Sequence, residues 1–276
     1  MLLLRLLYKE HLGKPLNLEN PITFTEKMQW LKLNDHNPFY HVMIDKYEVK
    51  RWVAELVGEK YIIPTIGIWE SFDDIDFNLL PDQFVLKDTT GGGGSGVIIC
   101  KDKSSLDIKD AKAKIESSRQ YDIYKSLGEW AYKGVKSRII AEEYMSNNGH
   151  SLSDYKFFCF NGTPQFFYVA SDRFNEEGDK PIFDFYDMNC QLLPFTNRGY
   201  RTSGLPEIHI EKFNEMIKIA SILSQNIPFL RVDLYLIDNN VFFGETTFYH
   251  DSGLYTFTPE TYDEIIGRKL NLHGKE

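Results

Sequence analysis

Cysteine is scarce in this chain, and no apolar run is long enough to cross a membrane. The three cysteines, Cys100, Cys159 and Cys190, lie far apart and lack the spacing of a metal site. We therefore expect reduced thiols in a cytosolic protein rather than a disulfide framework. The apolar start of the chain is interrupted by Arg5 and is not followed by a small-residue cleavage site, which argues against a signal peptide.

Positive charge is also in short supply. The 276 residues include 31 lysines and arginines against 40 aspartates and glutamates, so the formal net charge is −9. Binding to a nucleic-acid backbone requires a basic face, and we therefore expect no nucleic-acid partner. An anionic ligand would have to be met by a local cluster of lysine and arginine. The hydrophobic share of 42% is sufficient for a large core, in one domain or in closely joined lobes.

The N-terminal segment has the pattern of an amphipathic helix. Leu2, Leu3, Leu6 and Leu7 can form one helical face, which we expect to pack on the body of the protein. The alternative is a peripheral contact with the inner face of a membrane.

The most informative segment is FVLKDTTGGGGSGVIIC, from Phe84 to Cys100. An apolar strand ends at Lys87, a glycine-rich loop follows, and a second strand begins at Val97. Glycines without Cβ atoms can present successive backbone N–H groups to an oligophosphate. The string also matches G-x-G-x-x-G, but a dinucleotide fingerprint opens a helix and here a strand follows. The segment predicts a flap over nucleotide phosphates, and the alternative is a mobile hairpin without a ligand.

The remaining pattern predicts an α+β protein. The first part is mostly helical, with capping boxes at Thr23–Glu26 and Asp45–Glu48. Later segments alternate helices and strands without a regular βαβ order, which favours mainly antiparallel sheets. Three regions are expected: a mostly helical region 1–80, a small lobe 81–145 with the flap, and a C-terminal lobe 146–276.

An acidic hairpin near the C-terminus predicts a metal site. If Asp238-Asn239-Asn240 forms a three-residue loop, Asp233 lies opposite Glu245, whereas a two-residue turn would place Thr246 there. Two facing carboxylates repel each other unless a cation lies between them, and Mg²⁺ prefers oxygen ligands. The alternative is a surface hairpin with ordinary charges.

The order of these motifs resembles the ATP-grasp superfamily, and more narrowly the TupA-like ATP-grasp proteins found among teichuronopeptide and surface-polysaccharide biosynthesis genes. The resemblance rests on the strand that ends in lysine, the glycine loop, EEYM (Glu142–Met145), DYKFFCFNG, and the motifs R-V-D and G-E-T-T. It implies an ATP-grasp fold, in which two α+β lobes with mainly antiparallel sheets clasp a nucleotide.

The resemblance also implies the roles of individual residues around ATP. Lys87 is expected to contact the phosphates, which a flap covers. Asp154 is expected at the ribose, and Lys156 near the phosphates. The flap residues are Gly92, Gly93, Gly94 and Ser95, and the adenine hinge consists of Glu142, Glu143, Tyr144 and Met145.

Metal binding and group transfer are expected in the C-terminal lobe. The resemblance assigns Asp233 and Glu245 to Mg²⁺ and Arg231 to the transferring phosphoryl or acyl-phosphate group. Many ATP-grasp enzymes carry Glu-x-Asn as the second metal motif, whereas Thr247 stands at the third position here. Arg173 follows a strand near the nucleotide segment, and we expect it to hold the substrate carboxylate.

The implied activity is an ATP- and Mg²⁺-dependent carboxylate–amine ligase. It would form an amide through an acyl-phosphate, on a uronic acid of a bacterial surface polysaccharide or its precursor, with a small amine as the second substrate. Three alternatives stay open: a glycosyltransferase, a kinase of sugar or small-molecule hydroxyl groups, and a non-catalytic nucleotide-binding scaffold. Arg198, Arg201 and the basic segment DKYEVKR are weaker candidates for anionic sugar contacts.

Overall fold

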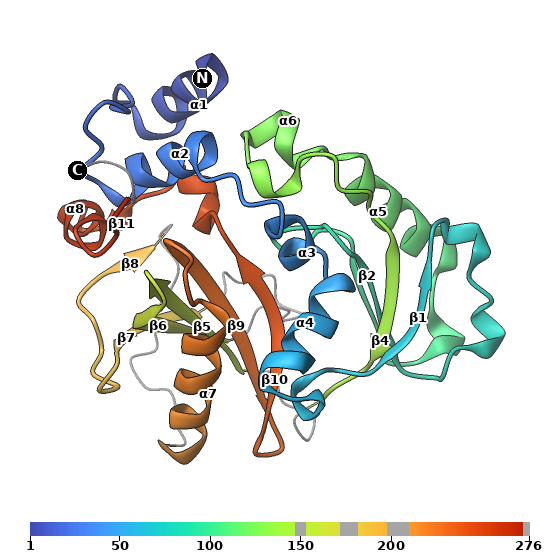
Figure 1. Cartoon of the computed structure of the whole chain (residues 1–276). Coiled ribbons are helices and arrows are strands. Elements are labelled where there is room, and N and C mark those ends of the chain that lie inside the picture. Colours follow the sequence, from blue (N-terminus) through green and yellow to red (C-terminus); the bar gives the residue numbers. More distant parts are fainter. Residues whose placement is uncertain (147–152, 172–181, 198–209, 273–276) are drawn as a thin grey trace. The chain divides into compact units, whose positions relative to one another are not determined.

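The computed structural model describes residues 1–146, 153–171, 182–197 and 210–272 (Figure 1). The chain divides into two compact units, each of which is described separately. The central unit comprises Asn37–Ser126 and Ala131–Met145, and the terminal unit comprises Met1–His36, Leu127–Trp130 and Ser146–Glu276. The boundary after residue 36 falls inside the mostly helical N-terminal region.

The central unit is built on a sheet of order β1-β4-β2-β3, in which all neighbouring strands are antiparallel (Figure 1). The flap joins the hairpin partners β2 and β3, so the sequence correctly predicted a strand on each side of the glycines. Its strands are β1 (Thr65–Trp69), β2 (Phe84–Asp88), β3 (Val97–Cys100) and β4 (Ile139–Glu143), and its helices are α3 (Tyr40–Ile44), α4 (Glu48–Val57), α5 (Ile108–Gln120) and α6 (Ile123–Leu127), the last ending at the unit boundary.

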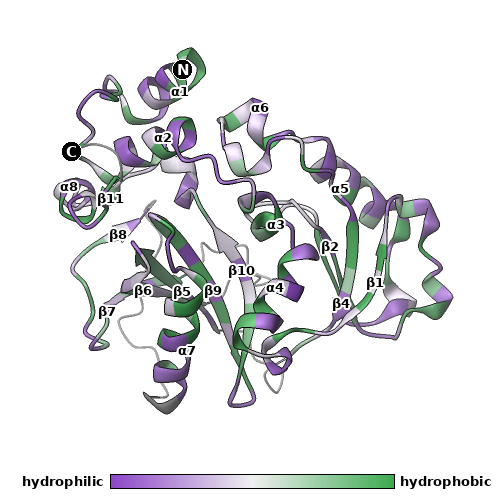
Figure 2. Cartoon of the chain, viewed as in Figure 1, coloured by the Kyte–Doolittle hydropathy of each residue, from purple (hydrophilic) through white to green (hydrophobic). Residues whose placement is uncertain are grey.

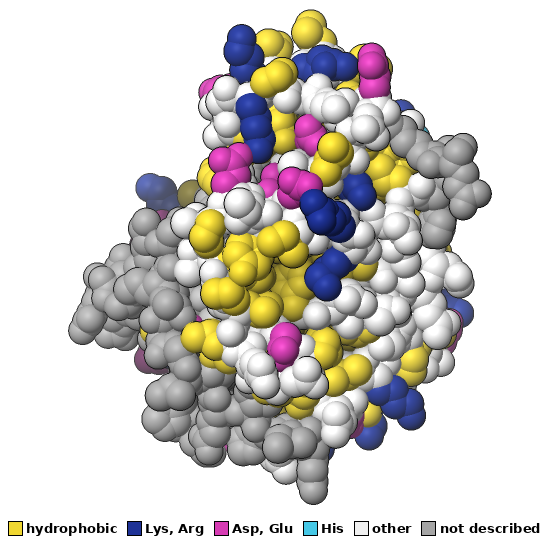
Figure 3. Space-filling model, turned by 90° about the vertical axis from the view of Figure 1, so that its left-hand side faces the viewer, with side chains coloured by type: hydrophobic (Ala, Val, Ile, Leu, Met, Phe, Trp, Pro, Cys, Tyr) yellow, Lys and Arg dark blue, Asp and Glu magenta, His cyan; other side chains and the backbone are white. Residues whose placement is uncertain are grey.

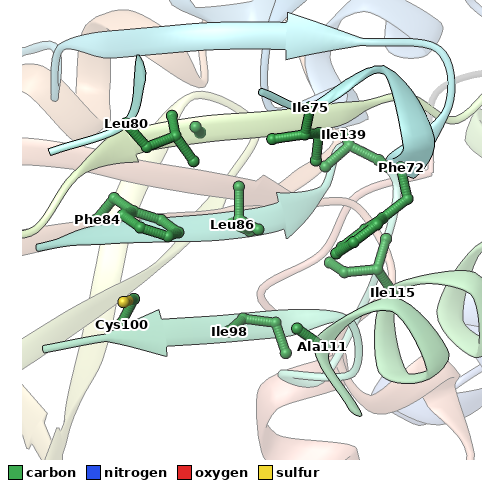
Figure 4. Close-up of a cluster of buried hydrophobic side chains, with 11 residues drawn as sticks. Phe72, Ile75, Leu80, Phe84, Leu86, Ile98, Cys100, Ala111, Ile115 and Ile139 are labelled. Atoms are coloured by element: carbon green, nitrogen blue, oxygen red, sulfur yellow. The ribbon is translucent and has the colours of Figure 1, made fainter. Parts of the chain in front are cut away.

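One face of this sheet packs on α5 to form the core of the central unit (Figure 4). Alternate strand residues point to the same face, so Phe84 and Leu86 on β2 meet Ile98 on β3 and Ile139 on β4. Ile115 covers them from α5. Each large apolar side chain buried here contributes roughly 1.5–3 kcal/mol of transfer free energy. This core fixes β2 and β4, the strands that carry the flap lysine and the predicted hinge.

The terminal unit contains a five-stranded antiparallel sheet of order β10-β9-β5-β6-β7. Helix α7 packs against β5, β6, β9 and β10, and hydrophobic residues run along β5, β9 and α7 (Figure 2). The strands are β5 (Ser153–Phe160), β6 (Thr163–Ser171), β7 (Ile182–Asp187), β9 (Phe229–Ile237) and β10 (Asn240–Thr247), with a small second sheet of β8 (Thr196–Asn197) and β11 (Phe257–Thr258). The helices are α1 (Leu2–Leu12), α2 (Phe24–Asn34), α7 (Ile210–Leu223) and α8 (Thr261–Gly267). Helices combined with antiparallel sheets confirm the predicted α+β class.

Local sequence signals explain several boundaries. The capping box at Thr23 and Glu26 is present at the start of α2, as predicted. The second predicted box is wrong in detail: α4 starts at Glu48, and Asp45 Oδ1 instead accepts hydrogen bonds from the N–H groups of Tyr47 (2.8 Å) and Glu48 (3.0 Å). Asn161-Gly162 joins β5 to β6 with φ of 49° and 81°, the turn that Asn-Gly favours.

Helix α1 packs through a different face from the one predicted. Leu4 and Tyr8 are its buried residues, whereas Leu2 is 72% exposed and Leu6 is 57% exposed. The top of Figure 3, where α1 lies, accordingly shows hydrophobic side chains beside Lys and Arg side chains. Among the described helices, none has the length and apolar character needed to cross a membrane.

Candidate nucleotide-binding site

The base of the flap is held by Asp88, the last residue of β2. Its carboxylate accepts hydrogen bonds from Ser118 Oγ (2.7 Å) and Ser137 Oγ (2.5 Å), and its N–H donates to Gly96 O (3.0 Å). Lys46 Nζ donates to Gly91 O at 2.5 Å. A Cβ built on Gly96 would lie 2.5 Å from Ser118 Cβ, so glycine is required there for packing. Gly91 and Gly96 therefore belong to a packed base rather than to the moving part of a flap.

The tip of the flap consists of Gly92, Gly93, Gly94 and Ser95. Ser95 closes a short turn, because its N–H (3.1 Å) and its hydroxyl (2.7 Å) both donate to Gly92 O. Gly93 and Gly94 have φ of 63° and 84°, a conformation that costs an L-residue roughly 1–2 kcal/mol. A Cβ at either position would meet no described atom within 4 Å. The tip can thus present backbone N–H groups to an anion without steric hindrance.

Lys87 lies in a cluster of three charged side chains in the central unit. Its Nζ is 2.5 Å from Glu142 Oε2 on β4, and Lys50 of α4 contacts the other carboxylate oxygen. Only 6% of the Glu142 side chain is exposed. Burial raises the pKa of Glu142, but Lys87 and Lys50 lower it more, so the net direction is down. The cluster carries two positive charges and one negative charge, a net excess of one positive charge.

The predicted adenine hinge divides between two faces of the sheet. Glu142 points toward the lysines, while Glu143 lies on the other face of β4 and is exposed. Glu143 and Tyr144 line an open depression of about 700 Å³ together with Ile66, Pro81 and Gln83. The two neighbouring glutamates therefore differ, because Glu142 is buried between lysines and Glu143 is exposed to solvent.

A second charged cluster lies in the terminal unit, on the adjacent strands β5 and β9. Lys156 pairs with Asp233 in the strand register, and its ammonium contacts the carboxylates of Asp233 and Asp154, the latter at 2.7 Å. Arg231 binds Asp233 in a bidentate manner, with Nε 2.8 Å from Oδ1 and Nη2 2.7 Å from Oδ2. Burial raises the pKa of Asp233, but Arg231 and Lys156 lower it to about 2. Asp233 is consequently ionised at neutral pH.

The acidic hairpin has the predicted pairing for a different reason. Asp233 lies opposite Glu245, but the connecting turn has two residues, Asp238 and Asn239, both at positive φ. That turn alone would place Gly244 opposite Asp233, and not the Thr246 expected for a two-residue turn. A β-bulge at Gly244 adds one residue to β10 and restores the partner. Gly244 is required because a Cβ there would lie 2.9 Å from the Tyr235 ring and 3.1 Å from Asp233 O.

The two carboxylates are not a cation-free pair, as the sequence argument assumed. Arg231 Nη2 lies 3.7 Å from Glu245 Oε1, and both oxygens of Asp233 already contact cations. No group of three or more His, Cys, Asp or Glu side chains that could hold a metal occurs among the described residues. Glu245 and Asp233 still provide hard oxygen donors of the kind that Mg²⁺ prefers, and Thr247 lies on the same strand face as Glu245. The residues fit Mg²⁺ if bound phosphate oxygens complete its coordination.

Several functional candidates fall elsewhere or were missed. Arg173, Arg198 and Arg201 lie outside the described residues. In DKYEVKR, Arg51 forms an exposed ion pair with Glu55, whereas Lys50 joins the Glu142 cluster. His250, which lies close to the second metal motif in the sequence, is buried against Arg231, with its Nδ1 3.0 Å from Arg231 Nη1.

The fold and these charged clusters define a protein of the ATP-grasp class. The sequence model of the TupA-like ATPgrasp family matches residues 26–271, and the chain therefore belongs to the TupA-like ATP-grasp family. A comparison with curated proteins finds no match.

Solved structures give more distant likenesses. D-alanine–D-alanine ligase from Bacillus anthracis is 15% identical, with 75% of this chain and 57% of that chain covered and a TM-score of 0.43. N5-carboxyaminoimidazole synthetase from Staphylococcus aureus is 13% identical, with coverages of 75% and 44% and a TM-score of 0.41. D-alanyl-alanine synthetase A from Vibrio cholerae is 11% identical, with coverages of 81% and 62% and a TM-score of 0.46. This chain spans 57% of the length of the Bacillus ligase and less than half of the length of N5-carboxyaminoimidazole synthetase.

Proposed function

We propose that this protein is an ATP- and Mg²⁺-dependent carboxylate–amine ligase that forms an amide through an acyl-phosphate. Membership of the TupA-like ATP-grasp family supports the use of ATP. The acceptor is a uronic acid of a bacterial surface polysaccharide or its precursor, and the second substrate is a small amine. The glycan context comes from the family resemblance.

The observation that carries this proposal is the cluster of Lys50, Glu142 and Lys87 beside the flap strand. The lysine side chains are only 13% and 18% exposed, and one carboxylate serves both of them. A partly buried excess of positive charge is stabilised by a bound anion, since water can no longer solvate it fully. A polyphosphate reaching this cluster would also come within range of a flexible glycine tip on the same hairpin. Lys50 thus joins Lys87 as a proposed phosphate contact.

The chemistry requires alignment and charge neutralisation rather than a protein nucleophile. A carboxylate oxygen of the acceptor attacks the γ-phosphorus, the bond to ADP breaks, and an acyl-phosphate forms. The amine nitrogen then attacks the acyl carbon, phosphate leaves, and the nitrogen loses a proton. Arg231 is proposed to stabilise the transferring group and Lys156 to contact the phosphates. Arg173 is proposed to hold the acceptor carboxylate.

We assign the remaining predicted positions to the nucleotide and the metal. Glu142, Glu143, Tyr144 and Met145 would form the adenine hinge, and Asp154 would contact the ribose. Asp233, Glu245 and Thr247 would hold Mg²⁺, which supplies a positive charge that neutralises phosphate oxygens. The exposed Leu2, Leu3 and Leu6 support a location at the inner face of a membrane.

The decisive experiment follows ADP and phosphate by mass-resolved product analysis after mixing protein, ATP, Mg²⁺ and candidate uronic acids, with and without amines. A ligase releases ADP only when both a carboxylate and an amine are present. A stable phosphate ester would instead identify a kinase, and transfer without ATP consumption would identify a glycosyltransferase. Asp233→Asn should abolish turnover, and biological activity that survives this change would favour a non-catalytic scaffold.

A matched pair of lysine variants tests the nucleotide site directly. Lys87→Met should weaken ATP binding by about tenfold or more, the loss expected for one charge-assisted contact. Lys112→Met removes an exposed lysine that pairs with Asp73 in the same unit and should leave ATP binding unchanged. Equal affinities for both variants would refute the assignment of Lys87.

A further inference from the structure

The guanidinium of Arg231 is held on two sides. Nε and Nη2 bind the two oxygens of Asp233, and this bidentate contact sets the plane of the group. The third nitrogen, Nη1, faces the imidazole of His250, whose Nδ1 lies 3.0 Å away. His250 follows β10 in the chain and lies in the loop His250–Gly253. One element besides β9, the loop that carries His250, therefore helps to determine where Arg231 points.

The arginine dictates the protonation of His250. An arginine side chain in a protein has only donors and keeps its proton, so Nδ1 must be the acceptor. The hydrogen of the neutral imidazole then resides on Nε2. A doubly protonated ring would place an N–H against the arginine N–H and add a second positive charge. Burial lowers the pKa of His250 to about 4, with Arg231 acting in the same direction and Asp251 against it.

Asn197 completes the arrangement at the other ring nitrogen. Its amide nitrogen lies 3.2 Å from His250 Nε2, and its Oδ1 is buried without a hydrogen-bond partner among the described residues. Two N–H donors cannot bond each other, so the imposed tautomer requires the amide to present its oxygen to Nε2–H. In that orientation the Nε2–H group donates to the amide oxygen, so each of these two atoms has a hydrogen-bond partner. Asp251 Oδ2, 3.5 Å from Nε2, favours the same tautomer.

The surroundings of the imidazole leave it little freedom. Its ring packs edge-on against Phe158 at a centroid distance of 4.8 Å, and it is only 3% exposed. A side chain fixed in this way can transmit its orientation to Arg231. The titratable and charged groups around His250 are Arg231, Asp251, Asp233, Lys156 and Tyr168.

We propose that His250 is a positioning residue for Arg231. As a neutral imidazole with its hydrogen on Nε2, His250 accepts a hydrogen bond from Nη1 and holds the guanidinium in place. Asn197 holds the imidazole in this tautomer. The geometry stands without any ligand. Its consequence for catalysis rests on the proposed function, in which Arg231 stabilises the transferring group.

The first test reads the tautomer by long-range ¹H–¹⁵N NMR of the ligand-free protein, with His250→Asn identifying the signal. We expect a neutral ring protonated on Nε2 at pH 7. An Nδ1–H tautomer or an imidazolium would overturn the proposal. Asn197→Leu removes the Nε2–H acceptor and should shift this signal, whereas His41→Asn, which changes an imidazole bonded to Ala131 O in the central unit, should not.

The second test compares two substitutions of His250 through hydrogen exchange at Arg231 Nε. The side-chain oxygen of His250→Asn can replace the Nδ1 acceptor, whereas His250→Leu cannot. Exchange should quicken about tenfold in His250→Leu, the loss expected for one hydrogen bond to a charged group, and stay near the wild-type rate in His250→Asn. Equal rates in the two variants would refute positioning. If His250→Leu does not fold, the tautomer read from the wild-type NMR spectrum still decides the proposal.

Steady-state kinetics then separate the positioning role of His250 from the proposed ligase activity. His250→Leu should lower kcat of ADP release by about 10–100-fold with little change in KM for ATP, because an arginine at the transferring group acts mainly in the transition state. A change confined to KM would contradict this role. A wild-type protein that releases no ADP with any substrate pair would refute the ligase, while the NMR and exchange results would still decide the role of His250.

Discussion

Glu142→Gln tests whether the lysine–glutamate cluster of the central unit is built to receive an anion. The change removes the negative charge that Lys50 and Lys87 share and keeps the size of the side chain. Two ammonium groups that shared one carboxylate would then repel each other in a site where Lys50 and Lys87 are 13% and 18% exposed.

The expected loss of stability is large. Removing one partner of a buried ion pair destabilises a protein by about 3–5 kcal/mol, and partial exposure of the lysines favours the lower end. Tripolyphosphate, an anion without a nucleoside, should restore part of this loss in the variant. The pKa of Glu142 in the folded protein lies below its ordinary value. The stabilisation that ionised Glu142 gives to the fold is therefore fully present above the ordinary pKa, and it is lost as the pH falls through the folded pKa. Glu142→Gln should lack this acid-dependent loss.

Native-state hydrogen exchange of the β2 and β4 amides is the appropriate assay, because a chain with two units need not unfold in one step. Asp73→Asn is the matched control, since it breaks an exposed pair with Lys112 and should cost less than about 1 kcal/mol. A Glu142→Gln variant within that same margin of the wild type, or one indifferent to tripolyphosphate, would refute the reasoning.

Three further predictions concern the flap, His250 and α1. Gly96→Ala should lower the melting temperature of the central unit, because the added Cβ meets Ser118. Gly93→Ala places its Cβ in open space and should mainly raise KM for ATP. Equal melting temperatures for the two variants would contradict the division into base and tip. Because burial depresses the pKa of His250 from 6.5 to about 4, the terminal unit should lose up to about 3 kcal/mol as pH falls from 6.5 to 4, a loss measurable by urea unfolding and absent in His250→Asn. Leu2→Asp with Leu6→Asp should reduce co-sedimentation with anionic phospholipid vesicles, and undiminished binding would exclude α1 as the contact.

The sequence predicted those features that local pattern controls. The strands around the flap and the Thr23 cap follow from residue type and spacing. Asp233 and Glu245 were paired correctly although the turn length was wrong, because the bulge at Gly244 offset the error. A lone glycine in a strand indicates a bulge only weakly, and the close approach of Tyr235 that requires it is a tertiary contact.

The missed residues depend on contacts between distant parts of the chain. Lys50 looks like an ordinary surface lysine in a basic helix, and only the fold brings it to Glu142. His250 lies near a motif, but its role depends on facing Arg231. Arg231 and Lys156 both reach Asp233, so the two carboxylates are not the unscreened pair that the spacing of residues predicted.

The anchoring of the flap by Asp88 limits how far a conformational change must spread. Because Ser118, Ser137 and Gly96 tie the ends of the loop to the sheet, a closing motion involves only the backbone dihedrals of Gly92–Ser95. Ordering four residues costs roughly 1–2 kcal/mol each at most, and the Ser95 turn has already removed part of that entropy. Closure is therefore expected to be fast and local, and the strands that hold Lys87 and Glu142 would stay in place between turnovers.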